Sequence, residues 1–490
     1  MRKNRLTLLS FVRHGALIGT LTAATSFPAV AAIDLGNLLS ILDSTSDASW
    51  AKVSLNLYSD AWPALDDRPL NNTSLANPNG VILPWSSFAW DSNRGELILF
   101  GGGHQNYAGN EVYLWQGTTQ QWTLGSLASQ MEQLPTPQGA IFIPVDGAIN
   151  APTSIHTYDN NEYLAVADRF LTLGGASFNS GAAQQIENPD GTLRSTGPYL
   201  WDPGKADGTK VGGTTGSGVN PAVPGGQMWQ DRDVRNLFTV TLPGGTLPVS
   251  NIDGTTAATV EGGKDVVYFT GGVGGGTDKY LFRYVIADVQ DPSQDTVSFI
   301  GSWNGGPSAY GAAGIDPASG LYVAMSDNAA SPFVVWDTRA APGIGNTSHG
   351  IVLSAAGLTS FDSSLISGID WDPSTQAFWV WSGGGSVWKL TAPASGVLTD
   401  PGLFIQETDA AALPLDGVPD NASSSGGVRG KWKYIPNLHA FMALEASPAG
   451  EVWLYRPEGW INPIPEPETY ALMLAGLALV GWIARRRDGT

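Results

Sequence analysis

The feature that most constrains the fold of this chain is a pair of short apolar stretches, joined by a tight turn, that recurs along its length. In four copies, a residue at the turn and the residue after the second stretch lie ten positions apart. These four pairs are Asp91 and Gly101, Asp316 and Ser326, Asp372 and Ser382, and Ile435 and Glu445. Two looser copies occupy residues 158–175 and 266–272. Aspartate followed by Pro or Ser suits a turn, because its carboxylate accepts backbone hydrogen bonds and Pro fixes φ.

Short strands repeated at this period are typical of a β-propeller, in which each copy supplies one small sheet. The 61 Gly and 32 Pro suit a turn-rich chain, and the 10% aromatic content suits strands. We predict an all-β propeller with six blades, and the irregular stretch 176–260 leaves room for a seventh. The last copy ends at Tyr455 without a fourth strand, while residues 50–55 resemble the strand that follows Trp122. An N-terminal strand is therefore expected to close the ring and leave no exposed sheet edge.

Charge and cysteine content exclude some partners and some cofactors. The formal net charge is −19, and such a surface repels phosphate backbones, so nucleic acid is not an expected partner. The chain has no cysteine, so no disulfide can stabilise it if it is exported. We find no tight cluster of His or carboxylate side chains with ligand spacing, and we expect neither a metal nor another cofactor.

Both ends of the chain have the composition of targeting segments. Residues 1–32 combine early basic residues, an apolar stretch at 16–24 and small residues at 29–32, which is the pattern of a secretory signal peptide. The propeller is expected over 33–458. The tail, 459–490, contains Pro465, Glu466 and Pro467, then 15 apolar residues at 470–484, then Arg485, Arg486 and Arg487. This apolar segment is shorter than the ~20 residues of a stable spanning helix, and the arginines would stay cytoplasmic.

The tail, over about 464–487, resembles the PEP-CTERM sorting signal of Gram-negative bacteria. The resemblance implies processing by an exosortase, transient anchoring in the inner membrane, and a final location at the cell surface or outside the cell. Proteins with this signal often accompany exopolysaccharide production. An ordinary membrane anchor is the alternative, and it would leave the same domain outside the inner membrane.

The first repeat resembles a kelch repeat. Its second strand, 97–100, ends in the glycines 101–103, a third strand follows at 110–115, and Trp122 comes seven residues after Trp115. The run 101–111 is similar to bacterial kelch proteins with galactose-oxidase-like propellers. Two later copies depart from the pattern, one of them by replacing the double glycine with Ser326 and Asp327.

The kelch resemblance also implies where a ligand would bind. In kelch propellers, ligands usually bind on the face where the innermost strand of each blade starts and the second strand ends. The candidate ligand-binding residues on that face are Trp85, Ser86, His104, Gln105, Tyr107, His156, Asp231, Arg232, Tyr310, Arg429 and Lys431. Aromatic rings stack on the apolar face of a sugar, and polar groups bind its hydroxyls. Structural roles remain open for several of them, since His104 can bond a backbone carbonyl, and Arg429 and Lys431 can each pair with a carboxylate.

Three functions are compatible with these features. The first is a non-catalytic, surface-sorted binding module for exopolysaccharide or another extracellular component. The second is a carbohydrate-active enzyme of the hydrolase or lyase type, which needs paired carboxylates or a Tyr/His acid–base set in one pocket. A copper radical oxidase like galactose oxidase is disfavoured, because its tyrosine is cross-linked to a cysteine that this chain lacks. The third is a protein-interaction scaffold.

Overall fold

The computed structural model describes residues 33–463 with short gaps, so the expected signal peptide and most of the expected tail lie outside the described residues. The gaps are 70–76, 84, 137–138, 146, 179–184, 188–192, 196, 234–237, 243–244, 251, 274–278, 304–310, 327–330, 355–360, 394, 409–416 and 422–426. Within the described ranges, no helix is long and apolar enough to cross a membrane.

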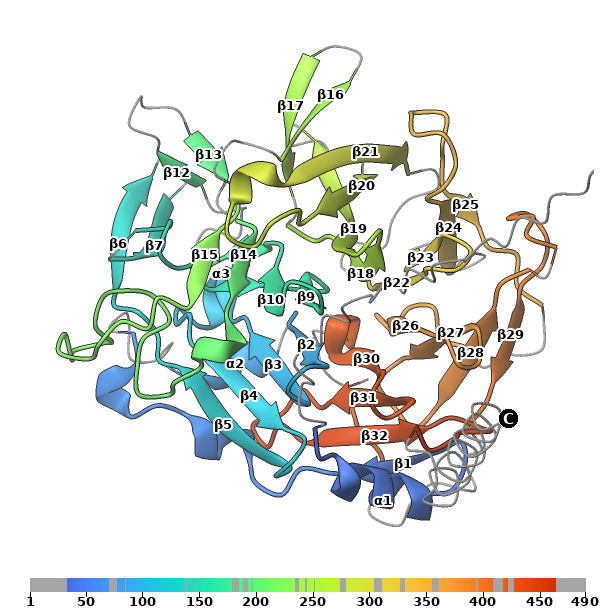
Figure 1. The fold of residues 1–490 in the computed structure, drawn as a ribbon, viewed down its shortest axis with the longest axis horizontal. Helices are drawn as coiled ribbons and strands as arrows, with labels where there is room; N and C mark the ends of the chain where they lie inside the picture. Colours follow the sequence, from blue (N-terminus) through green and yellow to red (C-terminus); the bar gives the residue numbers. More distant parts are fainter. Residues whose placement is uncertain are drawn as a thin grey trace, which may run out of the picture. The chain divides into compact units, whose positions relative to one another are not determined.

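Six antiparallel sheets, each with four main strands, form the blades (Figure 1). Blade 1 contains β2 (Ser87–Asp91), β3 (Glu96–Phe100), β4 (Val112–Gln116) and β5 (Gln121–Ser126). Blade 2 contains β9 (Asn161–Leu164), β10 (Arg169–Thr172), β14 (Tyr199–Trp201) and β15 (Trp229–Asp231). Blade 3 contains β18 (Thr256–Glu261), β19 (Lys264–Val273), β20 (Lys279–Val285) and β21 (Thr296–Ser302).

The C-terminal half supplies the other three blades. Blade 4 contains β22 (Ala313–Asp316), β23 (Leu321–Met325), β24 (Phe333–Asp337) and β25 (His349–Gly350). Blade 5 contains β26 (Gly368–Asp372), β27 (Ala377–Trp381), β28 (Val387–Thr391) and β29 (Leu403–Gln406). Blade 6 contains β30 (Trp432–Ile435), β31 (Ala440–Leu444), β32 (Val452–Arg456) and, from the N-terminal segment, β1 (Ser49–Lys52).

The innermost strands of the six blades form a closed ring. β2 contacts β9, β9 contacts β18, and the contacts continue through β22, β26 and β30 back to β2. This arrangement confirms the predicted six-bladed all-β propeller. The irregular stretch 176–260 supplies no seventh blade among the described residues: it completes blade 2 with β14 and β15 and begins β18 of blade 3.

An N-terminal strand closes the ring, as predicted. β1 pairs with β32 in antiparallel register, with Trp50 opposite Tyr455. The Trp50 ring lies 5.6 Å from the rings of Trp381 and Trp432, and its indole N–H donates to the carbonyl of Gly385 at 2.9 Å. Blade 6 therefore joins strands from opposite ends of the chain, and β32 is not left as a sheet edge.

The hydrophobic core lies between the faces of successive blades. Separate clusters of buried residues join blades 1 and 2, 2 and 3, 3 and 4, 4 and 5, and 5 and 6. The tight turns between first and second strands have the expected chemistry. Asp91, Asp316 and Asp372 each accept a backbone N–H two residues ahead, at 2.7–2.8 Å.

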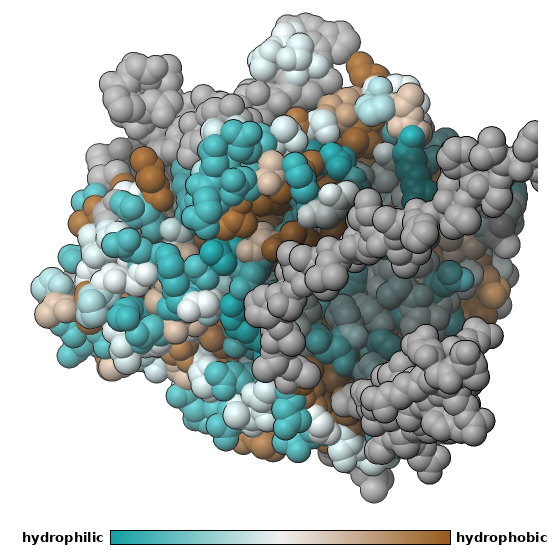
Figure 2. Space-filling view, viewed as in Figure 1, coloured by the Kyte–Doolittle hydropathy of each residue, from teal (hydrophilic) through white to brown (hydrophobic). Residues whose placement is uncertain are grey.

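Further elements lie outside the four main strands of each blade. The helices are α1 (Gly36–Ser44), α2 (Asn79–Ile82) and α3 (Gly103–Asn106), with 3₁₀ turns η1 (Tyr58–Ala61), η2 (Leu65–Asp67), η3 (Pro203–Lys205), η4 (Pro292–Gln294) and η6 (Arg429–Lys431). The additional strands are β6 (Met131–Thr136), β7 (Gly139–Pro144), β8 (Ile155–His156), β11 (Ala176–Ser177), β12 (Gln185–Glu187), β13 (Leu193–Ser195), β16 (Thr239–Leu242) and β17 (Gly245–Ser250). Figure 2 shows hydrophilic residues spread over one face of the molecule, with hydrophobic residues in small groups between them.

Candidate functional site

Two groups of side chains lie at opposite ends of the innermost strands. The start-face cluster lies where these strands begin, on the face that the kelch resemblance implied. The channel pocket lies toward the ends of the same strands. The start-face cluster consists of Trp85, His104, Asn106, His156, Tyr158, Arg429 and Lys431.

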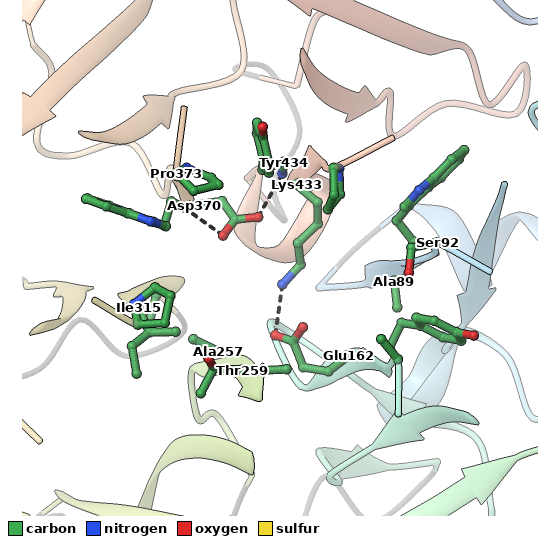
Figure 3. Close-up of a pocket in the computed structure, with 18 of the residues that line it drawn as sticks. Ala89, Ser92, Glu162, Ala257, Thr259, Ile315, Asp370, Pro373, Lys433 and Tyr434 are labelled. Carbon is green, nitrogen blue, oxygen red and sulfur yellow. Dashed lines mark hydrogen bonds and ion pairs between the residues drawn. The ribbon is translucent and has the colours of Figure 1, made fainter. Parts of the chain in front are cut away.

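The channel pocket has a volume of about 400 Å³ and receives residues from all six innermost strands (Figure 3). This volume falls within the range of small-molecule sites, about 300–1,000 Å³. It is lined by Ala89, Trp90, Ser92, Glu162, Tyr163, Ala165, Ala257, Ala258, Thr259, Ala313, Ile315, Pro317, Asp370, Trp371, Pro373, Lys433, Tyr434, Pro436 and His439.

An ion-pair network involving Lys433 forms the polar part of the channel pocket. Lys433 Nζ lies 3.0 Å from Glu162 Oε1 and 3.5 Å from Asp159 Oδ1. Burial favours the neutral amine, but the negative charges of Glu162, Asp159 and Asp370 outweigh it and raise the pKa of Lys433 above its usual value. Lys433 is therefore charged at all physiological pH values.

Asp159 and Asp370 connect neighbouring blades through backbone hydrogen bonds. Asp159 Oδ2 accepts the N–H groups of Thr256 and Ala313, on blades 3 and 4, at 3.2 and 3.0 Å. Asp370 Oδ2 accepts the N–H of Tyr434, on blade 6, at 2.7 Å. Burial raises the pKa of Asp159 to about 7 and that of Asp370 to about 6. These bonds give both carboxylates a structural role at the axis of the ring.

Glu162 differs from the two aspartates because part of its carboxylate remains available. Its Oε1 accepts from Lys433 and, at 2.9 Å, from the hydroxyl of Thr256. Within the described part of the chain, no hydrogen bond uses Oε2. Glu162 therefore offers an acceptor to a ligand in the channel pocket.

Aromatic rings from four blades line the channel pocket beside these charges. They are Trp90, Tyr163, Trp371 and Tyr434. The Trp90 indole N–H donates to Asn437 Oδ1 at 2.9 Å, and the Tyr163 hydroxyl donates to Asp168 Oδ1 at 2.6 Å. These bonds restrict the orientations of two of the rings.

The channel pocket was missed by sequence reasoning, although the repeats contain a signal for it. In three innermost strands a charged residue stands directly before an aromatic one: Glu162 before Tyr163, Asp370 before Trp371, and Lys433 before Tyr434. Because the repeats align, these pairs occupy equivalent places around the ring, and a charged residue in an otherwise apolar inner strand needs a partner. Recognising these pairs would have predicted that Glu162, Asp370 and Lys433 lie close together at the centre of the ring.

At the other end of the strands, the start-face cluster brings together several of the predicted residues. The ring of His156 lies 4.6 Å from that of Trp85 and 5.4 Å from that of His104. The Arg429 guanidinium lies 6.0 Å from the Trp85 ring and 5.3 Å from the Tyr158 ring. Trp85 and His104 are partly exposed, whereas His156 and Arg429 are buried.

His156 is neutral in this cluster. Its Nε2 lies 2.7 Å from Asn106 Nδ2, a nitrogen that can only donate, so His156 Nε2 accepts this hydrogen bond. Burial, with smaller electrostatic contributions from His104, Arg429 and Lys431, lowers the pKa of His156 to about 3.

The backbone of the start-face cluster is strained. Trp85, His104, Tyr158 and Arg429 have φ values of 42°, 43°, 52° and 53°. Residues with a Cβ rarely adopt this left-handed region, and such strain is concentrated at functional sites. The four residues come from three different blades or their loops, so local sequence alone does not explain why they coincide.

Lys431 is the buried amine of the start-face cluster. Its side chain is fully buried, and its Nζ has no hydrogen-bond partner within the described part of the chain. Burial and the neighbouring Arg429 charge lower its pKa well below the usual value.

The other predicted residues lie elsewhere or have structural contacts. Ser86 donates its hydroxyl to the carbonyl of Ile82 at 2.9 Å, and Tyr107 is buried beside Glu111. Arg232 forms a buried bidentate ion pair with Asp295, at 2.8 and 2.9 Å.

Three predicted residues remain. Asp231 accepts the backbone N–H of Asp233 at 3.1 Å. Gln105 belongs to α3, but its side chain is not among the described ones, and Tyr310 falls in the gap 304–310. Over the described residues, no three His, Asp or Glu side chains are grouped so that they could hold a metal ion.

The chain is similar to two solved structures at low sequence identity. One is a gluconolactonase from Xanthomonas campestris, with 11% identity, a TM-score of 0.34, and coverage of 80% of this chain and 97% of that one. The other is an α-L-arabinanase from Penicillium chrysogenum complexed with arabinobiose, with 11% identity, a TM-score of 0.35, and coverage of 76% and 92%. Both TM-scores are below 0.5, so neither similarity says what this chain binds or does.

No curated protein sequence matches the chain. Its C-terminal residues do match a known family of sorting signals. Residues 463–487 match the PEP-CTERM protein-sorting motif, which indicates an exported protein that is processed by an exosortase and sorted to the cell surface or the extracellular space.

Proposed function

We propose that this exported propeller is a non-catalytic binding module that takes a saccharide into the channel pocket. The saccharide would belong to exopolysaccharide or to another glycan of the cell surface. One observation carries the proposal: a pocket of about 400 Å³ combines aromatic residues from four blades with the charges of Glu162, Asp370 and Lys433.

The chemistry of the channel pocket suits a sugar. An aromatic ring covers the apolar C–H face of a sugar, and ionised groups form strong hydrogen bonds with its hydroxyls. Glu162 Oε2 is available as an acceptor among the described residues, and Lys433 supplies N–H donors. The start face, where the candidate residues were expected, is the second candidate surface. Its polar groups are less accessible: Arg429 and Lys431 are 1% and 0% exposed, whereas Glu162 and Lys433 in the channel pocket are 9% and 7% exposed.

We also propose that the blades are of the kelch type. Two details support this. Gly102 and Gly103 have φ values of 116° and 23°, which accounts for glycine after the second strand. Trp115 and Trp122 are directly opposite each other on β4 and β5, so their seven-residue spacing sets the two rings in one cross-strand pair.

The test of saccharide binding is a titration of the full-length protein with oligosaccharides from a panel of bacterial exopolysaccharides. Trp371→Ala removes one aromatic wall of the channel pocket and should weaken binding at least about tenfold, which corresponds to about 1.4 kcal/mol. Ser92→Tyr should weaken binding as well, because it narrows the pocket without removing a core residue. Trp62→Ala is the matched control, since this partly buried Trp does not line the channel pocket.

The outcomes separate the possibilities. Saturable binding that both pocket variants lose and Trp62→Ala keeps would support the proposal. Binding that survives both variants, in proteins with wild-type circular dichroism, would move the site to another face. No binding to any member of the panel would favour a protein-interaction scaffold.

One observation favours a glycoside hydrolase as the second candidate. Glu162 and Asp370 place two carboxyl groups in one pocket, and burial raises the pKa of Asp370 to about 6, which suits a general acid. Against this, both oxygens of Asp370 already accept backbone N–H groups. The chain length of the bound glycan after incubation distinguishes hydrolysis from binding. Shortening by the wild type but not by Glu162→Gln would establish hydrolysis, and an unchanged length would support binding alone.

A further inference from the structure

Two lysines that stand two positions apart in the chain have opposite environments. Both Lys431 and Lys433 are buried. Lys433 is paired with Glu162 and Asp159 and stays charged, whereas Lys431 Nζ has no hydrogen-bond partner in the described part of the chain. The ion-pair network explains why a lysine stands at 433, but no hydrogen bond among the described residues accounts for an amine at 431.

A buried amine without a partner destabilises a fold. Transfer of an unpaired polar group from water to the interior is unfavourable, and an apolar side chain of similar length avoids this cost. A methionine at 431 would fill similar space without an amine. An amine at this position therefore points to chemistry that requires one.

The charged and titratable groups around Lys431 favour its neutral form. Arg429 and Lys431 belong to the same 3₁₀ turn, η6, and His156 lies close enough for the charge of Lys431 to affect its titration. Asp159 lies against Gly430, but its ion pair is with Lys433 and its carboxylate hydrogen bonds are with backbone N–H groups. A lysine that is desolvated and next to another cation is the usual form of a nucleophilic lysine.

We propose that Lys431 is a nucleophilic amine that forms a reversible imine with the aldehyde group of a small hydroxyaldehyde or an open-chain reducing sugar. This site is distinct from the channel pocket and does not rest on saccharide binding there. The observations that carry it are the complete burial of Lys431, its unpartnered Nζ, and the adjacent Arg429, together with the strained residues of the start-face cluster.

The reaction balances without a further reagent. The lone pair of Nζ attacks the carbonyl carbon, and a proton moves from nitrogen to the former carbonyl oxygen, which gives a carbinolamine. The second nitrogen proton then leaves with the hydroxyl group as water, while the C=N bond forms. Nothing is oxidised or reduced, and addition of water reverses the reaction.

The test is reductive trapping with glycolaldehyde and cyanoborohydride at pH 7 on the native full-length protein, followed by peptide mass mapping. We expect Lys431 to acquire a hydroxyethyl group at least about tenfold faster than Lys389, because each unit by which a pKa lies closer to the working pH gives about tenfold more neutral amine. Lys389 is the internal comparison, a partly exposed lysine whose ammonium lies 5.3 Å from the Trp379 ring. Lys433 should remain unmodified because its ammonium is paired.

The variant Lys431→Met provides the control. It should lose the adduct, leave the labelling rate of Lys389 unchanged, and unfold at a higher urea concentration than the wild type, since an uncompensated buried amine has been removed. An unmodified Lys431 in the native wild-type protein would overturn the proposal, as would labelling no faster than that of Lys389. Both of these outcomes are measured on the wild-type protein, so the test is valid even if the variant fails to fold.

Discussion

At the residue scale, the glycines after the second strand of blade 1 allow a close backbone approach that positions the start-face cluster. Gly103 has a φ of 23°, and a Cβ added there would lie 2.4 Å from the Cα of Ile155 and 2.1 Å from the backbone N of His156. Glycine therefore lets α3 approach β8 closely, which places His104 and Asn106 beside His156. The glycines are visible in the sequence as part of the kelch-like pattern, but the backbone that lies against Gly103 is about fifty residues further along the chain.

Gly103→Ala should destabilise the protein by about 3 kcal/mol or more, because the added Cβ overlaps backbone atoms and the φ value is unfavourable. Gly147→Ala is the matched control: it has a φ of 86° but nothing within 4 Å of its added Cβ, so only the conformational cost of about 1–2 kcal/mol remains. Urea unfolding of both variants measures the difference. Equal losses would contradict the close approach.

A single buried carboxyl group gives a second prediction at this scale. Burial, with a smaller contribution from the Asp91 charge, raises the pKa of Glu96 to about 7 in the folded state. The stability that its protonated form contributes is complete below the unfolded pKa of about 4.3 and is lost as the pH rises to about 7. Relative to Glu96→Gln, the wild type should therefore lose roughly 2–3 kcal/mol of unfolding free energy between pH 4 and pH 7.

The measurement is chemical unfolding of both proteins at several pH values. The difference between wild type and Glu96→Gln should level off above pH 7. A difference that stays constant from pH 4 to pH 8 would show that Glu96 has an ordinary pKa in the folded protein.

At the element scale, strand β1 shows what the repeat pattern could predict. The missing fourth strand of the last repeat and the likeness of residues 50–55 to the strand after Trp122 predicted the closure. The structure adds the reason it is stable: the Trp50 ring packs among Trp381, Trp432 and Tyr455, joining blade 6 to blade 5.

Trp50→Ala should cost about 3–5 kcal/mol of unfolding free energy, as expected for a large aromatic side chain removed from a core. Leu55→Ala, at a position 67% exposed just after the same strand, should change stability by less than about 0.5 kcal/mol. Thermal or urea unfolding measures both. Similar values for the two variants would show that β1 is not an integral strand of blade 6.

The strands and turns could be predicted from the sequence, but the side-chain pairs between blades could not. The repeats predicted the inner strands, their turns and the six-bladed ring, because these features depend on local patterns that recur along the chain. They did not give the pairing of Lys433 with Glu162, because those residues are 271 positions apart and meet only when the ring closes. Arg232 illustrates the same difficulty, since its partner Asp295 comes from the next blade.

At the scale of the whole molecule, a ring of blades is combined with a C-terminal sorting motif. The PEP-CTERM motif indicates export and sorting to the cell surface or the extracellular space. The channel pocket, formed where all six innermost strands meet, would then face material outside the cell. Without cysteine, the exported ring depends on its core and on closure by β1.

Glu466→Ala should impair exosortase processing, because it changes the central residue of the Pro-Glu-Pro part of the motif. The expected result is accumulation of the uncleaved precursor, detected by the intact mass of the protein recovered from the producing cells. The substitution lies outside the blades, so the urea midpoint of the purified protein should not change. Normal processing of the variant would show that this residue is not needed for recognition.

Saccharide binding in the channel pocket is best tested by a crystal structure of the protein with the oligosaccharide that binds it most tightly in the titration. We expect a sugar ring in the channel pocket, packed against Trp371 or Trp90, with a hydroxyl donating to Glu162 Oε2. A sugar bound at the start-face cluster or on the outer strands, with the channel pocket empty, would contradict it.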